Sequence, residues 1–225
     1  AFEIAYSFRL LVKDGLPVTV SEIAPDDWMD IWRAWDLLEA NKRVLQRAKL
    51  RVEGTIEDGA HLAGPVGLGV NARIRSGAYI EGPVFIDEDS DIGPNCYIRL
   101  YTSIGKNVRI GNGCEIKNSI IMDSTHIGHL SYMGDSVIGA GCNFGAGTIT
   151  ANLRLDEKPV KVVIKNKLID SGLRKLGIFT GDNVKTGINV SFMPGVKVEP
   201  NALIGPNVSV YRDLLHIKGV KIDDS

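Results

Sequence analysis

The feature that most constrains this chain is a repeat of six residues. From Leu50 to Ile116 every sixth residue is Ile or Leu, at twelve consecutive positions. A period of six matches neither the 3.6 of a helix nor the 2 of a strand, and it is typical of a parallel β-helix. A smaller residue precedes each of these positions by two, from Gly54 and Ala60 to Val108 and Cys114. We call this series of positions the Ile lane. The same six-residue period returns at Thr180, Thr186, Phe192, Val198, Ile204 and Val210.

The repeat has a simple physical meaning. Each hexapeptide forms one short strand and one corner, and three of them close a triangular coil of eighteen residues. Successive coils stack at the strand spacing of roughly 4.8 Å. The Ile lane points inward, and the second inward position must be small because the prism is narrow there. No coil can bury its own face, so stability comes from neighbouring coils. We therefore expect an all-β, parallel β-helix; spacing alone does not determine its hand.

Length, charge and cysteine count narrow the class of protein. With 225 residues and a formal net charge of −1, the chain can form one sizeable core plus an appendage, and its surface favours neither nucleic acid nor membrane as partner. It has no run of eighteen apolar residues and no signal-like start, so a cytoplasmic location is expected. Three cysteines argue against a disulfide framework, and Cys96, Cys114 and Cys142 are predicted to be core fillers.

The regions outside the repeat are less regular. Residues 1–13 and 27–49 are predicted to be largely helical, with a strand between Val18 and Ile23. The start in the middle of a pattern suggests a fragment. Between Met122 and Leu176 the period slips, and an excursion runs from Ala151 to Gly177. Its alternation around Val160–Ile164 predicts a protruding hairpin with a turn at residues 166–167. Repeat proteins often place insertions on their binding face, so chemistry is expected here.

Two segments near this slip carry a specific resemblance. They are Gly128-His129-Leu130-Ser131-Tyr132-Met133-Gly134-Asp135 and Asn143-Phe144-Gly145-Ala146-Gly147-Thr148-Ile149-Thr150-Ala151-Asn152. They resemble the acetyltransferase domain of the bifunctional N-acetylglucosamine-1-phosphate uridylyltransferase/glucosamine-1-phosphate acetyltransferase family, in its archaeal form. The resemblance implies a left-handed β-helix at residues 49–213, with a hairpin at 153–176 and a tail at 214–225. The segment 28–41 looks like the end of a nucleotidyltransferase domain, so residues 1–48 are expected to be a short α/β remnant that caps the first coil.

The chemistry of N-acetylation fits the matched positions. An attacking amine needs a base, for which His is suited near neutral pH, and the resemblance gives that role to His129. The oxyanion needs a preorganised N–H donor, which the resemblance assigns to Ala146. It places Arg99 and Lys117 at the phosphate of a sugar phosphate, with Glu115 orienting Lys117. Lys117 lies eighteen residues after Arg99, which independently predicts that the two stack on one edge of the prism.

The remaining matched positions concern the sugar and the coenzyme. The resemblance places Tyr132, Asn143 and Asn152 at the sugar, and Lys158 and Lys161 at anions; Gly187, Pro206 and Arg212, with Ala146, are expected at coenzyme A. No protein metal ligand is expected: magnesium would serve only the missing nucleotidyltransferase domain, where Asp30 matches a metal-binding position. The family's Tyr and Pro are replaced by Leu153 and Leu100, which affects substrate identity more than reaction type.

The resulting expectation is an acetyl-CoA-dependent N-acetyltransferase acting on glucosamine 1-phosphate or galactosamine 1-phosphate, feeding UDP-N-acetylhexosamine synthesis. The resemblance implies a homotrimer with sites between prisms, and a full-length parent that is also a sugar-1-phosphate nucleotidylyltransferase. Two alternatives remain open. A γ-type carbonic anhydrase would need three metal-binding histidines, whereas His126 and His129 lack a nearby third. A non-catalytic trimerisation module would need none of the motif.

Overall fold

The computed structural model describes residues 4–215 and divides into two compact units, Ala1–Asp30 and Ile31–Ser225. Within the first, the predicted helix is present as α1 (Ile4–Lys13), and a 3₁₀ turn, η1, covers Pro25–Asp27. The strand predicted between Val18 and Ile23 is wrong: these residues are exposed, form no regular element and pair with no strand of the described sheets. An unpaired strand leaves its backbone groups without ladder partners and is not stable alone. The described part of this unit is thus helical, not α/β.

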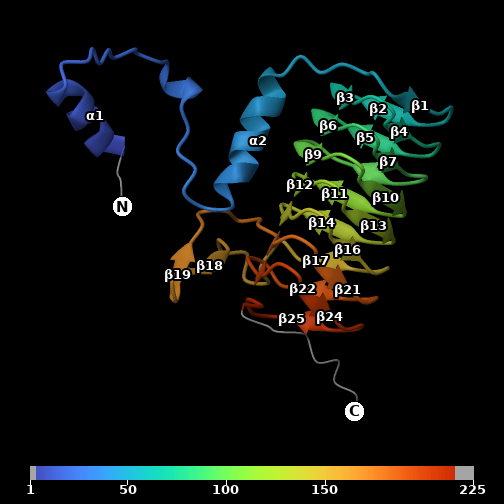
Figure 1. Cartoon of the computed structure of the whole chain (residues 1–225). Helices are drawn as coiled ribbons and strands as arrows, with labels where there is room; N and C mark the ends of the chain where they lie inside the picture. Colours follow the sequence, from blue (N-terminus) through green and yellow to red (C-terminus); the bar gives the residue numbers. More distant parts are fainter. Residues whose placement is uncertain (1–3, 216–225) are drawn as a thin grey trace. The chain divides into compact units, whose positions relative to one another are not determined.

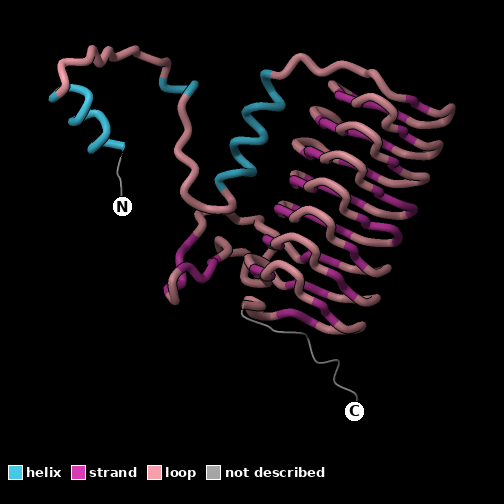
Figure 2. Tube along the Cα trace, in the orientation of Figure 1, coloured by secondary structure: helices cyan, strands magenta, loops and turns pink. Residues whose placement is uncertain are grey.

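The second unit is a stack of parallel coils whose strands form three sheets, as Figures 1 and 2 show. The first sheet contains β1 (Thr55–Ile56), β4 (Arg73–Ile74), β7 (Asp91–Ile92), β10 (Arg109–Asn112), β13 (His126–His129), β16 (Asn143–Phe144), β21 (Lys185–Thr186) and β24 (Leu203–Ile204). The second contains β2 (His61–Ala63), β5 (Tyr79–Glu81), β8 (Tyr97–Ile98), β11 (Glu115–Lys117), β14 (Tyr132–Gly134), β17 (Ile149–Thr150), β22 (Ser191–Phe192) and β25 (Ser209–Val210). The third contains β3 (Val66–Leu68), β6 (Val84–Ile86), β9 (Thr102–Ile104), β12 (Ile120–Ile121), β15 (Val137–Ile138), β20 (Phe179–Thr180) and β23 (Lys197–Val198). The predicted parallel β-helix is confirmed.

The Ile lane forms the core of this stack. From Leu68 to Ile116 every lane residue is at most 1% exposed. Ile56 is 38% exposed, because the first coil has no complete coil above it. The predicted burial of the three cysteines is also confirmed; all three are free, and burial raises the pKa of the Cys96 thiol to about 12.

Removing a lane side chain in the middle of the stack should be costly. Ile98 is fully buried, and Ile98→Ala should lower the free energy of unfolding by about 3 kcal/mol through lost burial and the cavity left behind. Ile56→Ala is the matched control and should cost less than about 1 kcal/mol, since its side chain already meets solvent. Urea unfolding measures both. Equal losses would show that the lane does not carry the stability assigned to it.

The slip in the repeat has a definite structural origin. Strand partners are 18 residues apart in the upper coils, as for Ile80 and Ile98, but 17 apart between Ser103 and Ile120. After Ile149 the separation jumps to 42, to Ser191, because the predicted excursion is inserted between β17 and β20. The inward lane survives, since each shortened coil loses one corner residue and keeps its strand register.

The excursion contains the predicted hairpin, formed by the antiparallel strands β18 (Lys161–Ile164) and β19 (Lys167–Asp170). Its turn is at Lys165–Asn166, one residue earlier than predicted. Both residues have positive φ, 47° and 61°, as a two-residue turn of the I′ type requires. The side chains of Val160 and Val162 are buried against the third sheet. The hairpin therefore packs on its own solenoid along one side.

The helix predicted within residues 27–49 forms as α2 (Asp36–Arg47), but it does not cap the first coil. Trp35 and Leu38 are buried in one cluster with Val137, Val160, Val162, Leu176 and Phe179, which belong to middle and late coils and to the excursion. The Trp35 and Phe179 rings are 6.4 Å apart between centroids. The apolar stripe of α2 is satisfied by the side of the stack and not by its open end. Among the described residues, no helix has the length and apolar character needed to cross a membrane.

Candidate active site

The second sheet carries two cations at equivalent positions of adjacent coils. Arg99 and Lys117 follow Ile98 and Ile116, which are register partners, and the Arg99 N–H donates to the Ile116 carbonyl at 2.8 Å. This confirms the predicted stacking on one edge. Both side chains line a cavity of about 370 Å³. The edge thus presents two positive charges to one cavity.

Each of the two cations has a carboxylate partner. Arg99 Nη1 lies 2.9 Å from Glu115 Oε1, and this hydrogen bond raises the pKa of Arg99. Lys117 Nζ lies 3.2 Å from Asp135 Oδ2. The prediction that Glu115 orients Lys117 is therefore wrong: Glu115 reaches back one coil to Arg99, because the longer guanidinium spans the inter-strand gap.

Asp135 is the site residue that sequence reasoning missed. Its side chain is almost fully buried, and its carboxylate accepts hydrogen bonds from Asn118 Nδ2 at 2.8 Å and Asn152 Nδ2 at 2.5 Å, besides pairing with Lys117. A buried carboxylate is retained only when it is paired and hydrogen-bonded. Asp135 therefore fixes Lys117 and Asn152 relative to one another. Its spacing of eighteen from Lys117, the same as between Arg99 and Lys117, was the signal that could have revealed it.

Tyr132 stands beside this carboxylate on the same sheet. Its Oη accepts a hydrogen bond from Asn152 Nδ2 at 3.0 Å. Burial raises the pKa of Tyr132, and the Asp135 and Glu115 carboxylates add to the rise, so the hydroxyl keeps its proton and can donate it to a ligand. A Cβ at Gly134 would lie 2.3 Å from Tyr132 Oη, which explains the glycine there.

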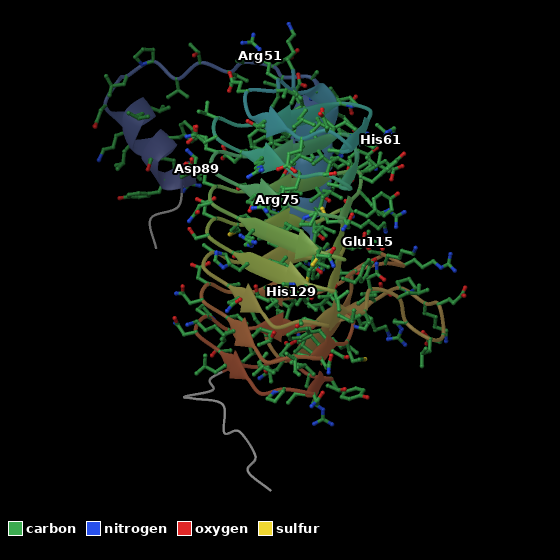
Figure 3. All side chains as sticks on the ribbon, turned by 90° about the vertical axis from the view of Figure 1, so that its right-hand side faces the viewer. Arg51, His61, Arg75, Asp89, Glu115 and His129 are labelled. Carbon is green, nitrogen blue, oxygen red and sulfur yellow. The ribbon has the colours of Figure 1, made fainter. Side chains whose placement is uncertain are left out.

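His129 ends β13, at the corner between the first and second sheets. Its side chain is exposed, and its imidazole makes no hydrogen bond within the described residues. Its carbonyl accepts hydrogen bonds from Ser131 Oγ at 2.7 Å and from the Gly147 N–H at 3.2 Å. The backbone is therefore held while the ring stays free to act on a ligand. Figure 3 labels His129 together with Glu115, which lies on the adjoining sheet.

The hydrogen bond from the Gly147 N–H to the His129 carbonyl connects the His129 corner to the turn that carries Ala146. The same local pattern, an inward residue followed by Gly and Ala, occurs at Ala140, where the N–H donates to Asp182 Oδ1 of the next coil at 2.8 Å. The residue equivalent to Asp182 beneath Ala146 is Ile188, which has no acceptor on its side chain. Within the described residues, the Ala146 N–H is left without a hydrogen-bond acceptor. It is available to a developing oxyanion.

The other predicted site residues fall into separate groups. Asn143 is exposed on the first sheet, in register with His126 and Lys185. Gly187 and Pro206 line one cavity of about 300 Å³.

A further cavity, of about 330 Å³, is lined by Lys161 of the hairpin and Arg212 after the last coil. Lys158 is exposed, and its N–H donates to Asp156 Oδ1 at 3.3 Å. Within one chain, Lys158 and Lys161 do not line the cavity of Arg99. Across residues 4–215 no three His, Cys, Asp or Glu side chains gather as a metal ion would require.

Comparison with known proteins supports this assignment of fold and motif. The GMPPB C-terminal domain family matches residues 80–173, and the bacterial transferase hexapeptide family, with six repeats, matches residues 177–212. The second match agrees with a left-handed parallel β-helix.

Several curated relatives are similar over most of this chain. The bifunctional protein GlmU of Methanocaldococcus jannaschii is 54% identical over 83% of this chain and 46% of its own length. That of Methanococcus maripaludis strain C7 is 62% identical over 83% and 45%. The bifunctional sugar-1-phosphate nucleotidylyltransferase/acetyltransferase of Sulfurisphaera tokodaii is 50% identical over 94% and 53%. The chain spans about half the length of these relatives. From its hexapeptide stack, its motif and these matches, the chain belongs to the acetyltransferase-domain family of the bifunctional sugar-1-phosphate nucleotidylyltransferase/acetyltransferases.

Proposed function

We propose that this chain transfers an acetyl group from acetyl-CoA to the amine of an amino-sugar 1-phosphate, glucosamine 1-phosphate or galactosamine 1-phosphate. We assign this activity to residues 49–213 and treat residues 1–48 as the remnant of a nucleotidyltransferase domain. The observation that carries the proposal is the joint presence of a free imidazole at His129 and an uncapped N–H at Ala146, tied together through Gly147. Acyl transfer to an amine needs such a base and such a donor.

The roles follow from the chemistry of each group. The neutral amine attacks the thioester carbonyl, His129 takes the proton that the nitrogen loses, and the Ala146 N–H stabilises the tetrahedral oxyanion. Collapse of that intermediate expels the coenzyme A thiolate, which takes the proton that His129 holds and leaves the imidazole neutral for the next turnover. Tyr132 and Asn152 hydrogen-bond the sugar, and Arg99 and Lys117 hold the phosphate. No covalent enzyme intermediate is needed.

The coenzyme and the second protomer complete the proposed site. Asn143, Gly187 and Pro206 lie on or beside the first sheet, whereas Arg99, Lys117 and Tyr132 lie on the second. One prism therefore presents the residues of the first sheet and those of the second sheet on different faces. We propose a homotrimer in which the first sheet of one protomer meets the second sheet of the next. Lys158, Lys161 and Arg212 then supply cations for the two anionic ligands, and sedimentation of the active chain should give a trimer.

Release of coenzyme A thiol tests the activity directly. We expect thiol release from acetyl-CoA in the presence of glucosamine 1-phosphate or galactosamine 1-phosphate, and little with the dephosphorylated amino-sugars. Comparing the two sugars determines the substrate preference. A trimer that releases no thiol with either would favour the non-catalytic trimerisation module instead.

Arg99→Ala should raise KM for the sugar phosphate by about 10- to 100-fold, because a hydrogen bond to a charged group is worth roughly 1.5–3 kcal/mol. The kcat value should change much less, since the phosphate does not react. Steady-state kinetics with and without the phosphate on the substrate provide the check. Equal losses on phosphorylated and dephosphorylated amino-sugar would mean that Arg99 does not bind the phosphate.

A further inference from the structure

The cavity that holds Arg99 and Lys117 has a second wall made from outside the solenoid. Helix α2 contributes Leu38, Glu39 and Lys42, preceded by Trp35, and the excursion contributes Leu173 and Lys175. Two lysines from distant parts of the sequence therefore line the same volume as the two cations of the second sheet.

The position of α2 at this cavity is held by polar contacts to Tyr101, two residues after Arg99. Asn41 Nδ2 donates to the Tyr101 carbonyl at 2.8 Å, and Gln46 Nε2 donates to Tyr101 Oη at 3.2 Å. Lys42 Nζ lies 5.2 Å from the centre of the Tyr101 ring. Tyr101 has a φ of 63°, a conformation that bulky residues rarely adopt. Asn41 and Gln46, from successive turns of α2, thus both contact the corner at Tyr101, beside Arg99. These contacts fix the position of Lys42.

The charges at the cavity are not balanced. Arg99 pairs with Glu115, Lys117 pairs with Asp135, and Glu39 pairs with Arg43 of its own helix at 3.1 Å. Within the described part of the chain, neither Lys42 nor Lys175 has a carboxylate partner. Two ammonium groups without a counter-charge therefore face a cavity that already contains two paired cations. An anion with two negative charges complements this arrangement.

We propose that Lys42 of α2 and Lys175 of the excursion bind the phosphate dianion of the substrate, beside Arg99 and Lys117. This inference rests on the proposed function and extends it. Helix α2 would then be part of the acetyltransferase site and would select phosphorylated over unphosphorylated amino-sugars. Trp35 and Leu38 form one wall of the cavity, where Lys42 is half-buried and Lys175 is exposed.

Four charge-removing substitutions in the full chain test the proposal. Lys42→Met and Lys175→Met should each raise KM for the amino-sugar 1-phosphate about three- to tenfold, with kcat within about twofold, since each removes one partly exposed charge. Lys49→Met, just after α2, and Arg174→Met, whose partner is Glu157, are matched controls that do not line the cavity. Both should leave KM unchanged. Met keeps the helix propensity of Lys, so α2 should persist, and thermal unfolding checks this.

Inorganic phosphate provides a second measurement that does not depend on catalysis. Calorimetric titration should give weaker phosphate binding for Lys42→Met and Lys175→Met than for the two controls. If the parent acetylates amino-sugar phosphates but the cavity variants match the controls in KM and phosphate affinity, the inference is overturned and the proposed function stands. If the parent acetylates nothing, the proposed function fails, and phosphate titration alone decides whether the two lysines bind this anion.

Discussion

His129→Ala should lower kcat for acetyl transfer by about 10²- to 10⁴-fold, the scale on which general-base catalysis contributes. The imidazole is exposed and makes no hydrogen bond within residues 4–215, so its loss leaves no buried partner unsatisfied. The carbonyl contacts of His129 involve only backbone and survive the change. Steady-state kinetics should therefore show a loss in kcat with little change in the unfolding temperature.

His126→Ala is the matched control for this experiment. His126 begins the strand that His129 ends, and it is likewise exposed, in register with Arg109 and Asn143. Its loss should leave kcat within about threefold, because His126 has no part in the proposed proton transfer and its exposed side chain leaves no buried partner unsatisfied. An active His129→Ala variant, or a His126→Ala variant that loses as much activity, would refute the assignment of the base to His129.

Ile188→Asp should lower kcat by about 10²- to 10³-fold, the usual effect of losing one oxyanion donor. The substitution supplies the cap that Asp182 provides for Ala140 one hexapeptide earlier, where the contact is 2.8 Å. A carboxylate at position 188 can accept the Ala146 N–H, which is then occupied before any oxyanion forms. Because the change adds a hydrogen bond to a turn that lacks one, the fold should be no less stable.

Ile188→Ala separates this effect from simple loss of the side chain. Ile188 is 52% exposed, so the alanine variant should fold and should keep most of the activity, since alanine cannot cap the Ala146 N–H. We would compare kcat and unfolding temperature for the two variants. Equal losses of kcat in both would mean that Ile188 acts by packing against a ligand, and the role of the Ala146 N–H would have to be abandoned.

The sequence alone determined the solenoid and the order of groups along its edge. In a stack of coils, neighbours in space are separated by a nearly constant number of residues, so counting along the chain predicts contacts. This is why the Ile lane predicted the core, and why the offset between Arg99 and Lys117 predicted that they stack. The excursion adds 24 residues to the one regular coil that would separate Ile149 from Ser191. The interruption of the six-residue period predicted this insertion.

Only the tertiary structure decided the contacts that have no fixed offset. Glu115 pairs with Arg99 and not with Lys117. The buried Asp135 carboxylate fixes Lys117 and Asn152. Helix α2 lies along the side of the stack, because its apolar stripe finds the buried faces of the third sheet and the excursion there. The strand expected between Val18 and Ile23 fails because nothing pairs with it. Repetition makes register a local property of the sequence, whereas side-chain pairing and helix docking depend on which distant surfaces come within reach.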